Sequence, residues 1–240
     1  MNRESVQTLI QSIRRELSQA ADVHTRQTAS HFFKEEVRVY GVKTALVTSI
    51  AKQFFQPIKD LTKDNIFSLC EELWKSGLME EAFIACQWSY QVHDRYEEQD
   101  LSVFERWLQR YVSNWATCDT LCNHSVGTLL EMFPVHLARI KTWTQSENRW
   151  MRRAAAVSLI IPARKGKFLA DVFQISDCLL TDGDDLVQKG YGWLLKAASQ
   201  AYQAEVLSYV MENKVRMPRT ALRYAIEKMP ADLKKQAMEK

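Results

Sequence analysis

The chain has 240 residues, of which 46% are hydrophobic and 25% are charged, and its net charge is +3. This composition suits a globular protein with a sizeable core, whereas no stretch reaches the roughly 18 uncharged apolar residues of a membrane span. Seven Gly and five Pro leave few turn signals for an all-β fold and favour helices with short connections.

Apolar residues recur at helical spacing along the chain, beginning with Val6, Leu9, Ile10, Ile13 and Leu17. No convincing two-residue alternation of a β-strand appears. Beyond this first helix, the spacing predicts helices near residues 25–36, 42–56, 63–76, 78–95, 100–112, 114–132, 135–144, 148–161, 167–180, 184–200, 203–213 and 219–238. Helix-stopping residues end three of them at Pro57, Gly77 and Pro134, and the last is expected to divide near Pro230.

An internal repeat appears in the second half of the chain. RWMRRAAAV (149–157) matches DLVQKGYGW (185–193), and RMPRTALRY (216–224) is a looser third copy. Each copy has a small residue, Ala154, Gly190 or Ala221, that permits a close approach of a partner helix. A period in the thirties built from two helices is typical of an α-solenoid. We therefore expect an all-α fold, an α-solenoid of HEAT-like helix pairs forming a curved superhelix, with residues 1–240 as a single repeat domain.

The charge is unevenly spread. Residues 1–138 hold 14 Lys/Arg and 18 Asp/Glu, whereas residues 139–240 hold 18 and 11, with clusters at Arg149, Arg152, Arg153, then Arg164, Lys165, Lys167, then Arg216, Arg219, Arg223. A polyanion such as a nucleic acid is a natural partner for the second half. Equivalent repeat positions share a face, so Arg153 and Lys189 should form part of a basic stripe. The alternative is a set of solvated charges, with Asp184 and Asp185 as salt-bridge partners.

The five cysteines are odd in number and mostly lie in apolar helical patterns, which indicates reduced, buried thiols. Cys118, Cys122 and His124 suggest a metal site, but no second Cys/His pair at ligand spacing exists. We therefore expect no metal site. No signal-peptide apolar run follows Met1, so we expect a cytoplasmic protein.

The stretch NWATCD (114–119) puts an aromatic ring and a carboxylate on one helix face. Trp115 and Asp119 are one turn apart, so their side chains reach the same region. On spacing alone, Trp115 and Trp193 suit a helical core better than a catalytic site, and Asp119 suits a solvated or capping position.

Four stretches of the sequence resemble the AlkD-like family of DNA alkylation repair glycosylases over nearly the full length of the chain. They are FFKEEVRVYGVKT (32–44), NWATCD (114–119), NRWMRRAA (148–155) and QKGYGWLL (188–195), in the family's order and at similar separations. No single motif decides the resemblance, but four in order on a HEAT-like pattern are fairly specific.

The resemblance implies a monofunctional glycosylase of base excision repair, without metal or organic cofactor. Its substrate would be double-stranded DNA with cationic N3- or N7-alkylated purines, and the protein would act as a monomer. The family's catalytic residues fall on Trp115, Asp119 and Trp193. Its arginine near the DNA backbone falls on Arg153, and we add Arg152 and Lys189 as further DNA-binding candidates.

The sequence departs from the family at three places. A tyrosine of the N-terminal helix is replaced by Phe32, an acidic residue after the first Trp is Ala116, and an Arg-Glu pair is Lys196-Ala197. These departures leave open a second hypothesis, a non-catalytic HEAT-repeat module that binds nucleic acid or protein. Nucleotide-binding, metalloprotease and esterase motifs are absent, so those classes have no support.

Overall fold

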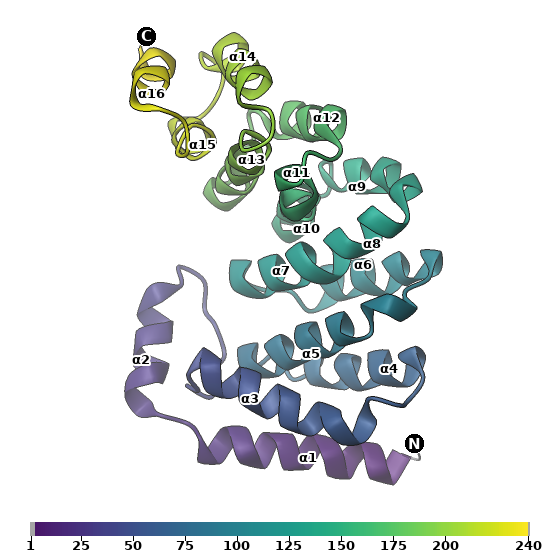
Figure 1. Ribbon diagram of the computed structural model, residues 1–240. Coiled ribbons are helices and arrows are strands. Elements are labelled where there is room, and N and C mark those ends of the chain that lie inside the picture. Colours follow the sequence, from purple (N-terminus) through teal and green to yellow (C-terminus); the bar gives the residue numbers. More distant parts are fainter. Residues whose placement is uncertain (1–2, 240) are drawn as a thin grey trace. The chain divides into compact units, whose positions relative to one another are not determined.

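A computed structural model describes residues 3–239, and its regular structure is helical (Figure 1). The helices group into two compact units, Met1–Thr120 and Leu121–Lys240. The described residues form no β-strand, and an isolated β-bridge joins Arg38 to Leu78 within the first unit. The all-α fold expected from the spacing is confirmed. None of the helices described is long and apolar enough to cross a membrane.

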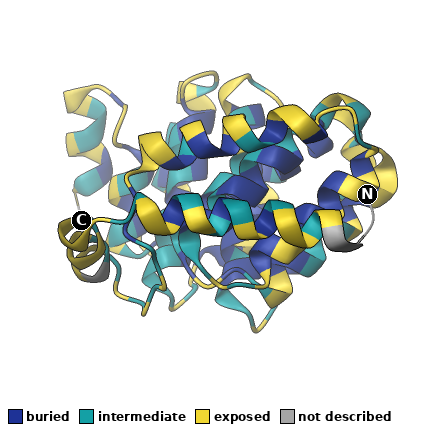
Figure 2. Cartoon of the chain, turned by 90° about the horizontal axis from the view of Figure 1, so that it is seen from below, coloured by how far each residue is buried: buried dark blue, intermediate teal, exposed yellow. Residues whose placement is uncertain are grey.

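The first unit contains α1 (Arg3–Gln19), α2 (Val23–Phe32), α3 (Thr44–Phe55), α4 (Lys63–Trp74), α5 (Met79–Gln91), α6 (Leu101–Arg110) and most of α7 (Trp115–Leu121). Helix α3 packs against α1 and α5, and α4 packs against α5 and α1. Each of these helices turns an apolar side inward, as the alternation of buried and exposed turns in Figure 2 shows. The core is rich in aromatic residues, with Trp88, Phe104 and Trp107 fully buried.

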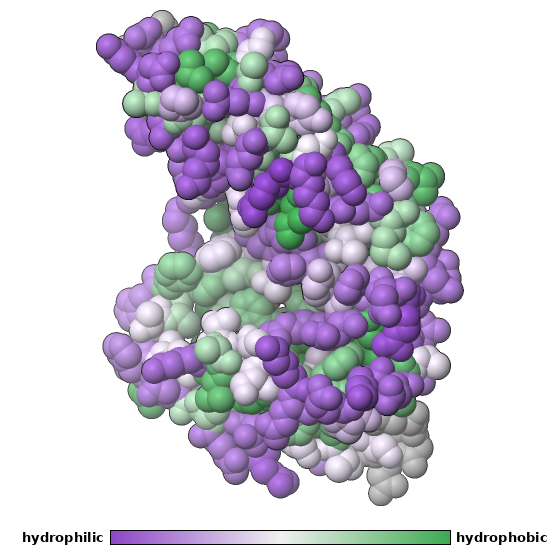
Figure 3. Space-filling model, viewed as in Figure 1, coloured by the Kyte–Doolittle hydropathy of each residue, from purple (hydrophilic) through white to green (hydrophobic). Residues whose placement is uncertain are grey.

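In the second unit, a π-helical turn (Cys122–Val126) leads into α8 (Gly127–Met132), α9 (Leu137–Trp143), α10 (Arg149–Val157), α11 (Ile160–Arg164), α12 (Leu169–Leu179), α13 (Asp185–Ala198), α14 (Gln203–Asn213), α15 (Arg219–Ala225) and α16 (Ala231–Met238). Helix α13 is its centre, because α10, α11, α12 and α15 all pack against it. The surface over α15 and α16 is mainly hydrophilic in the view of Figure 3.

The predicted repeat corresponds to real structural units. The first copy coincides with α10, the second forms the first part of α13, and the third comprises the three residues before α15 and all of α15 except its last residue. Helix α10 packs against α13, and α13 packs against α15, as HEAT-like repeats do. The small residues lie at these contacts: Ala154 and Ala221 are fully buried, and a Cβ added to Gly190 would lie 3.4 Å from the Arg153 side chain.

Three predicted helix limits are wrong. The helix predicted for 78–95 ends at Gln91, and a short 3₁₀ turn (His93–Arg95) follows it. The helix predicted for 25–36 ends at Phe32, because residues 38 and 40–42 form hydrogen bonds with α5 and its preceding residues instead. The helix predicted for 148–161 ends at Val157, and α11 begins at Ile160. Pro162 has no N–H to bond to Ser158, and its ring crowds that carbonyl, so a regular helix cannot continue.

Candidate active site

Helix α7 is held at its start by a side-chain cap. Asn114 Oδ1 accepts a hydrogen bond from the backbone N–H of Thr117 at 3.0 Å, and the Thr117 hydroxyl bonds back to Asn114. Such a cap satisfies an N–H that the first helical turn leaves without a partner. It fixes the register of the helix, so that Trp115 opens α7 and Asp119 follows one turn later. Asp119 is only 8% exposed, whereas Trp115 is partly exposed.

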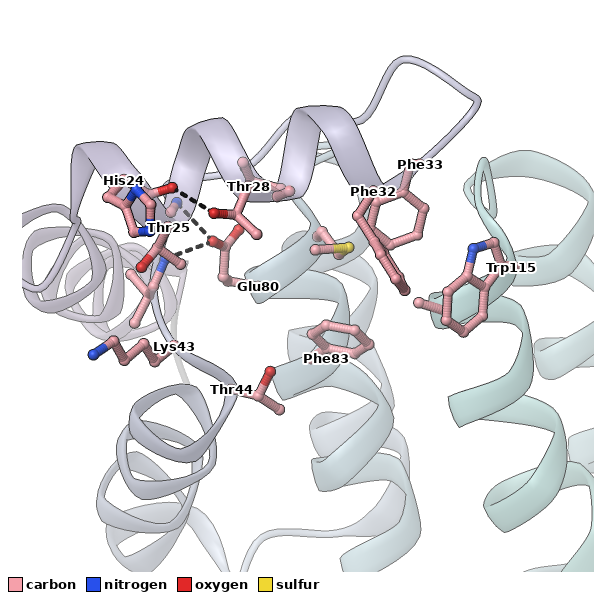
Figure 4. Close-up of a pocket in the computed structure, with 16 residues that line it drawn as sticks. His24, Thr25, Thr28, Phe32, Phe33, Lys43, Thr44, Glu80, Phe83 and Trp115 are labelled. Carbon is pink, nitrogen blue, oxygen red and sulfur yellow. Dashed lines mark hydrogen bonds between the residues drawn. The ribbon is translucent and has the colours of Figure 1, made fainter.

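Two aromatic side chains of the first unit contact Trp115. The ring centroids of Phe32 and Phe33 lie 5.7 and 5.4 Å from the ring of Trp115, and 5.3 Å from one another. Figure 4 shows both phenylalanines reaching from the end of α2 toward the start of α7. Offset and edge-on contacts at these distances are favourable for aromatic rings. Phe32 is nevertheless 66% exposed, so one side of the cluster faces solvent.

A cavity of about 430 Å³ lies beside this cluster in the first unit. Its walls come from α2, the segment after α2, the start of α3, the start of α5 and the start of α7. Four aromatic side chains line it: Phe32, Phe33, Phe83 and Trp115 (Figure 4). The cavity is thus an apolar recess with an indole ring at its edge, which suits a flat, apolar or cationic group.

The segment after α2 is fixed to α5 by a buried carboxylate. Glu80 accepts hydrogen bonds from the backbone N–H groups of Tyr40, Gly41 and Val42 at 3.0, 2.8 and 3.0 Å. Gly41 has φ +91°, and a Cβ there would lie 2.6 Å from the carbonyl oxygen of Asp22, so only glycine fits. The Gly turn in the first family-like stretch therefore holds α2 in place as one wall of the cavity.

A second carboxylate completes this anchor. Glu81 is fully buried, forms an ion pair with Arg14 at 3.1 Å and accepts a hydrogen bond from the Tyr40 hydroxyl at 2.7 Å. Burial and the hydrogen bond to Glu81 raise the pKa of Tyr40 above its usual range. The hydroxyl therefore stays protonated and remains a donor to Glu81 at any physiological pH.

Trp193 lies on α13 of the second unit, and its side chain is partly exposed. The residue before it, Gly192, sits tightly against α15: a Cβ there would lie 2.7 Å from the carbonyl oxygen of Ala221 and from the Cβ of Tyr224. The two glycines of QKGYGWLL thus serve two helix contacts, since Gly190 faces α10 and Gly192 faces α15. These contacts fix how α13 presents Trp193.

Arg153, the expected arginine near the DNA backbone, is only 5% exposed. Its guanidinium donates a hydrogen bond to the carbonyl oxygen of Leu186 in the first turn of α13, and its stem packs on Gly190. In this arrangement Arg153 connects α10 to α13.

Arg152 and Lys189 both have acidic partners. Arg152 lies 2.7 Å from Asp182 and also donates to the carbonyl oxygens of Ser146 and Glu147. Lys189 lies 2.7 Å from Asp185, which is the salt-bridge alternative raised by the sequence. The expected basic stripe on α10 and α13 is therefore largely neutralised by neighbouring residues.

Trp115 and Asp119 lie one turn apart on α7, but of the two only Trp115 lines the cavity. Trp193 and the three DNA-binding candidates lie on α10 and α13 of the second unit. Sequence reasoning missed Phe33, Phe83 and Glu80. Phe33 lies in the family-like stretch 32–44, directly after Phe32, so the sequence could have indicated it as a second aromatic residue of the site. Glu80 and Phe83 gave none, because their role depends on a segment about 40 residues away in the sequence.

Of the two cysteines suspected of metal binding, Cys118 lies on α7 and Cys122 begins the π-helical turn. Cys118 and Cys122 are both fully buried. Among the described residues, no three His, Cys, Asp or Glu side chains are grouped so that they could hold a metal ion.

Comparison with known proteins identifies the family. The sequence model of the DNA alkylation repair enzyme family matches residues 13–229. The chain belongs to this family. Membership supports a role in DNA alkylation repair, and hence an enzyme that acts on DNA.

A solved structure described as a predicted DNA alkylation repair enzyme from Enterococcus faecalis is also similar to this chain. The TM-score is 0.79 at 16% sequence identity, and the match covers 88% of this chain and 97% of the other. At this identity the likeness shows a shared fold. A search of curated proteins gives no significant match.

Proposed function

We propose that this member of the family is a monofunctional DNA glycosylase that hydrolyses the N-glycosidic bond of cationic N3- or N7-alkylated purines in duplex DNA. The observation that carries this proposal is the arrangement on α7. A carboxylate that is 8% exposed lies one turn from a partly exposed indole ring beside an aromatic cavity.

The chemistry needs little help at the base. Alkylation at N3 or N7 gives the purine a positive charge, so it departs as a neutral base when the glycosidic electron pair moves to its nitrogen. A general acid is then unnecessary, and catalysis concentrates on the sugar. Departure of the base builds positive charge at C1′, and a nearby carboxylate stabilises it.

Asp119 is our candidate for that carboxylate. Its low exposure strengthens its interaction with a cation, because fewer water molecules screen the charge. It would also orient the water whose oxygen bonds to C1′ and accept the proton that this water loses. The products are a free base, an abasic site and a proton.

Trp115 and Trp193 are our candidates for holding the cationic nucleotide. An aromatic face attracts a cation by about 0.5 to 2 kcal/mol, more when water is excluded. Phe32 and Phe33 support Trp115 from α2. The assignment of Trp193 rests on the resemblance of QKGYGWLL to the family's later motif. Among the DNA-binding candidates, Lys189 is the most accessible, with 30% of its side chain exposed.

The non-catalytic scaffold remains the second candidate, and the ion pairs of Arg152 and Lys189 favour it because they reduce the free positive charge. One experiment separates the two functions: release of free base from duplex DNA with 7-methylguanine or 3-methyladenine, under single-turnover conditions, by the native chain and by Asp119→Asn. A glycosylase releases base, and the variant does so at least about 100-fold more slowly.

Asp60→Asn is a matched control, because Asp60 is an exposed carboxylate of the same unit, and it should excise at the native rate. Binding of undamaged duplex should be unchanged or slightly tighter in Asp119→Asn. Lack of excision by the native chain, with DNA binding intact, would establish the scaffold instead. Loss of binding in Asp119→Asn would remove the catalytic role from this residue.

A further inference from the structure

Most of the Lys and Arg side chains of α10 and α13 in the second unit form ion pairs with acidic side chains of the same unit. Three of them form ion pairs with the acidic residues before and within the first turn of α13: Arg149 with Asp184 at 2.9 Å, Arg152 with Asp182 at 2.7 Å and Lys189 with Asp185 at 2.7 Å. A side chain in such a pair must give up its partner before it can bind a phosphate. The charge of the segment 149–189 is therefore a poor guide to where DNA would bind.

Unpaired positive charge lies at the other end of this unit. Residues 216–235 contain six Lys/Arg and two Asp/Glu, which gives them a net charge of +4. One of the two acids, Glu227, is paired with Lys196 of α13. Arg216, Arg219 and Arg223 are exposed, and their guanidinium groups have no hydrogen bond or ion pair within residues 3–239. We call these three residues the arginine ridge.

The ridge has a defined place on α15. Arg219 and Arg223 are one helical turn apart and so share a face, and Arg216 precedes them by three residues. The opposite side of α15 is apolar, with Ala221 and Leu222 buried. That side packs on α13, where Gly192 permits the close contact next to Trp193. The ridge is therefore mounted on a rigid element beside a proposed catalytic residue.

We propose that the arginine ridge, rather than the cations of α10 and α13, is the main phosphate-binding surface of the second unit, and that its partner is the backbone of duplex DNA. This inference rests on the proposed function for its partner. Arginine suits the task because its planar guanidinium binds two phosphate oxygens at once. A free arginine also gains the full counterion-release free energy on binding, which an arginine already paired with a carboxylate does not.

The test is equilibrium binding of an undamaged fluorescent duplex, measured at several salt concentrations. We expect Arg219→Ala/Arg223→Ala to weaken binding by roughly tenfold or more at moderate salt. The slope of log affinity against log salt should fall by about 1.8, since each lost phosphate contact removes about 0.9. Both side chains are exposed, so circular dichroism should show an unchanged fold.

Two variants of the same unit serve as controls. Arg164→Ala removes an exposed arginine of α11 that has no hydrogen bond or ion pair within the described residues, and Lys141→Ala removes a lysine of α9 that is paired with Asp171 at 2.6 Å. Each should change the slope by less than about half a unit.

An unchanged slope in the double variant would overturn the ridge, and so would an equal loss per charge in Arg164→Ala. Either outcome leaves the glycosylase intact, because excision is measured separately. Missing excision with the expected change in slope would overturn the glycosylase alone, and absence of any DNA binding would overturn both.

Discussion

The two units of the chain differ in what they present for chemistry. The first has a net negative sequence, yet it contains an aromatic recess and the enclosed carboxylate Asp119. The second has a net positive sequence, yet most of the cations on its central helices are paired with carboxylates. The comparison teaches that net charge does not locate a binding surface: the pairing state of each side chain does.

This difference suggests a division of work. The first unit would supply the carboxylate for the reaction at the sugar, and the arginine ridge of the second unit would supply affinity for the DNA backbone. Substitutions that affect one contribution and spare the other can sharpen or break the division.

Trp115→Ala should have a large effect on the reaction, smaller only than that of Asp119→Asn. Loss of the aromatic face is expected to slow single-turnover excision roughly 30-fold, which corresponds to about 2 kcal/mol, the upper range for a desolvated cation–π contact. Binding of undamaged duplex should stay within about twofold. Phe32→Ala is the control, because Phe32 belongs to the same cluster but is 66% exposed. Equal loss of rate in both variants would mean that the cluster as a whole, and not the indole, matters.

Gly192→Ala should destabilise the second unit by about 1 to 2 kcal/mol. The added Cβ would lie 2.7 Å from the Ala221 carbonyl oxygen, so α13 and α15 must separate, and the better helix propensity of alanine offsets only part of the cost. Urea unfolding measures this loss. Gly183→Ala is the control, since nothing lies within 4 Å of a Cβ there. A stable Gly192→Ala variant would contradict the close packing that fixes Trp193.

The smallest expected effect is on the stability of the fold at acid pH, and it involves one carboxylate in each unit. Burial would raise the pKa of Glu71, but hydrogen bonds from Arg106 and Tyr111 outweigh burial and hold that pKa below its usual range. Burial would also raise the pKa of Glu131, but hydrogen bonds from Lys165 and Lys167 outweigh burial and lower that pKa. A depressed pKa contributes stability above the unfolded pKa, and this contribution is lost as pH falls through the folded pKa.

Glu71→Gln and Glu131→Gln should therefore each reduce the free energy of unfolding near pH 6 by less than about 1 kcal/mol, as for other partly exposed pairs. As the pH falls below the depressed folded pKa of each carboxyl group, the variants and the native chain should converge. Urea unfolding across this pH range measures the effect, and a difference that persists at low pH would assign the loss to packing.

Much of the fold followed from the sequence because it depends on local patterns. Helical spacing located the helices, Pro230 separated α15 from α16, and the repeat identified α10, α13 and α15 as equivalent. The one-turn spacing put Trp115 and Asp119 on a single helix. These features need only the periodicity of the backbone and the rules for helix ends.

The remainder depended on contacts between distant segments. The burial of Arg153 could not be predicted, because it results from the packing of α13 against α10. The end of α2 at Phe32 depends on Glu80, which binds the following segment from another helix. Likewise, the sequence showed three basic clusters and favoured the one around Arg153, whereas the ion pairs of the folded chain point to the arginine ridge.

The most direct measurement of the account is the single-turnover rate of base release at increasing protein concentration, for the native chain, Asp119→Asn and Arg219→Ala/Arg223→Ala. The account predicts that Asp119→Asn loses at least about 100-fold of the maximal rate, with the half-saturating concentration unchanged. The double variant should keep the maximal rate and need a roughly tenfold higher protein concentration. A double variant that loses its maximal rate, or an Asp119→Asn variant that excises at the native rate, would contradict it.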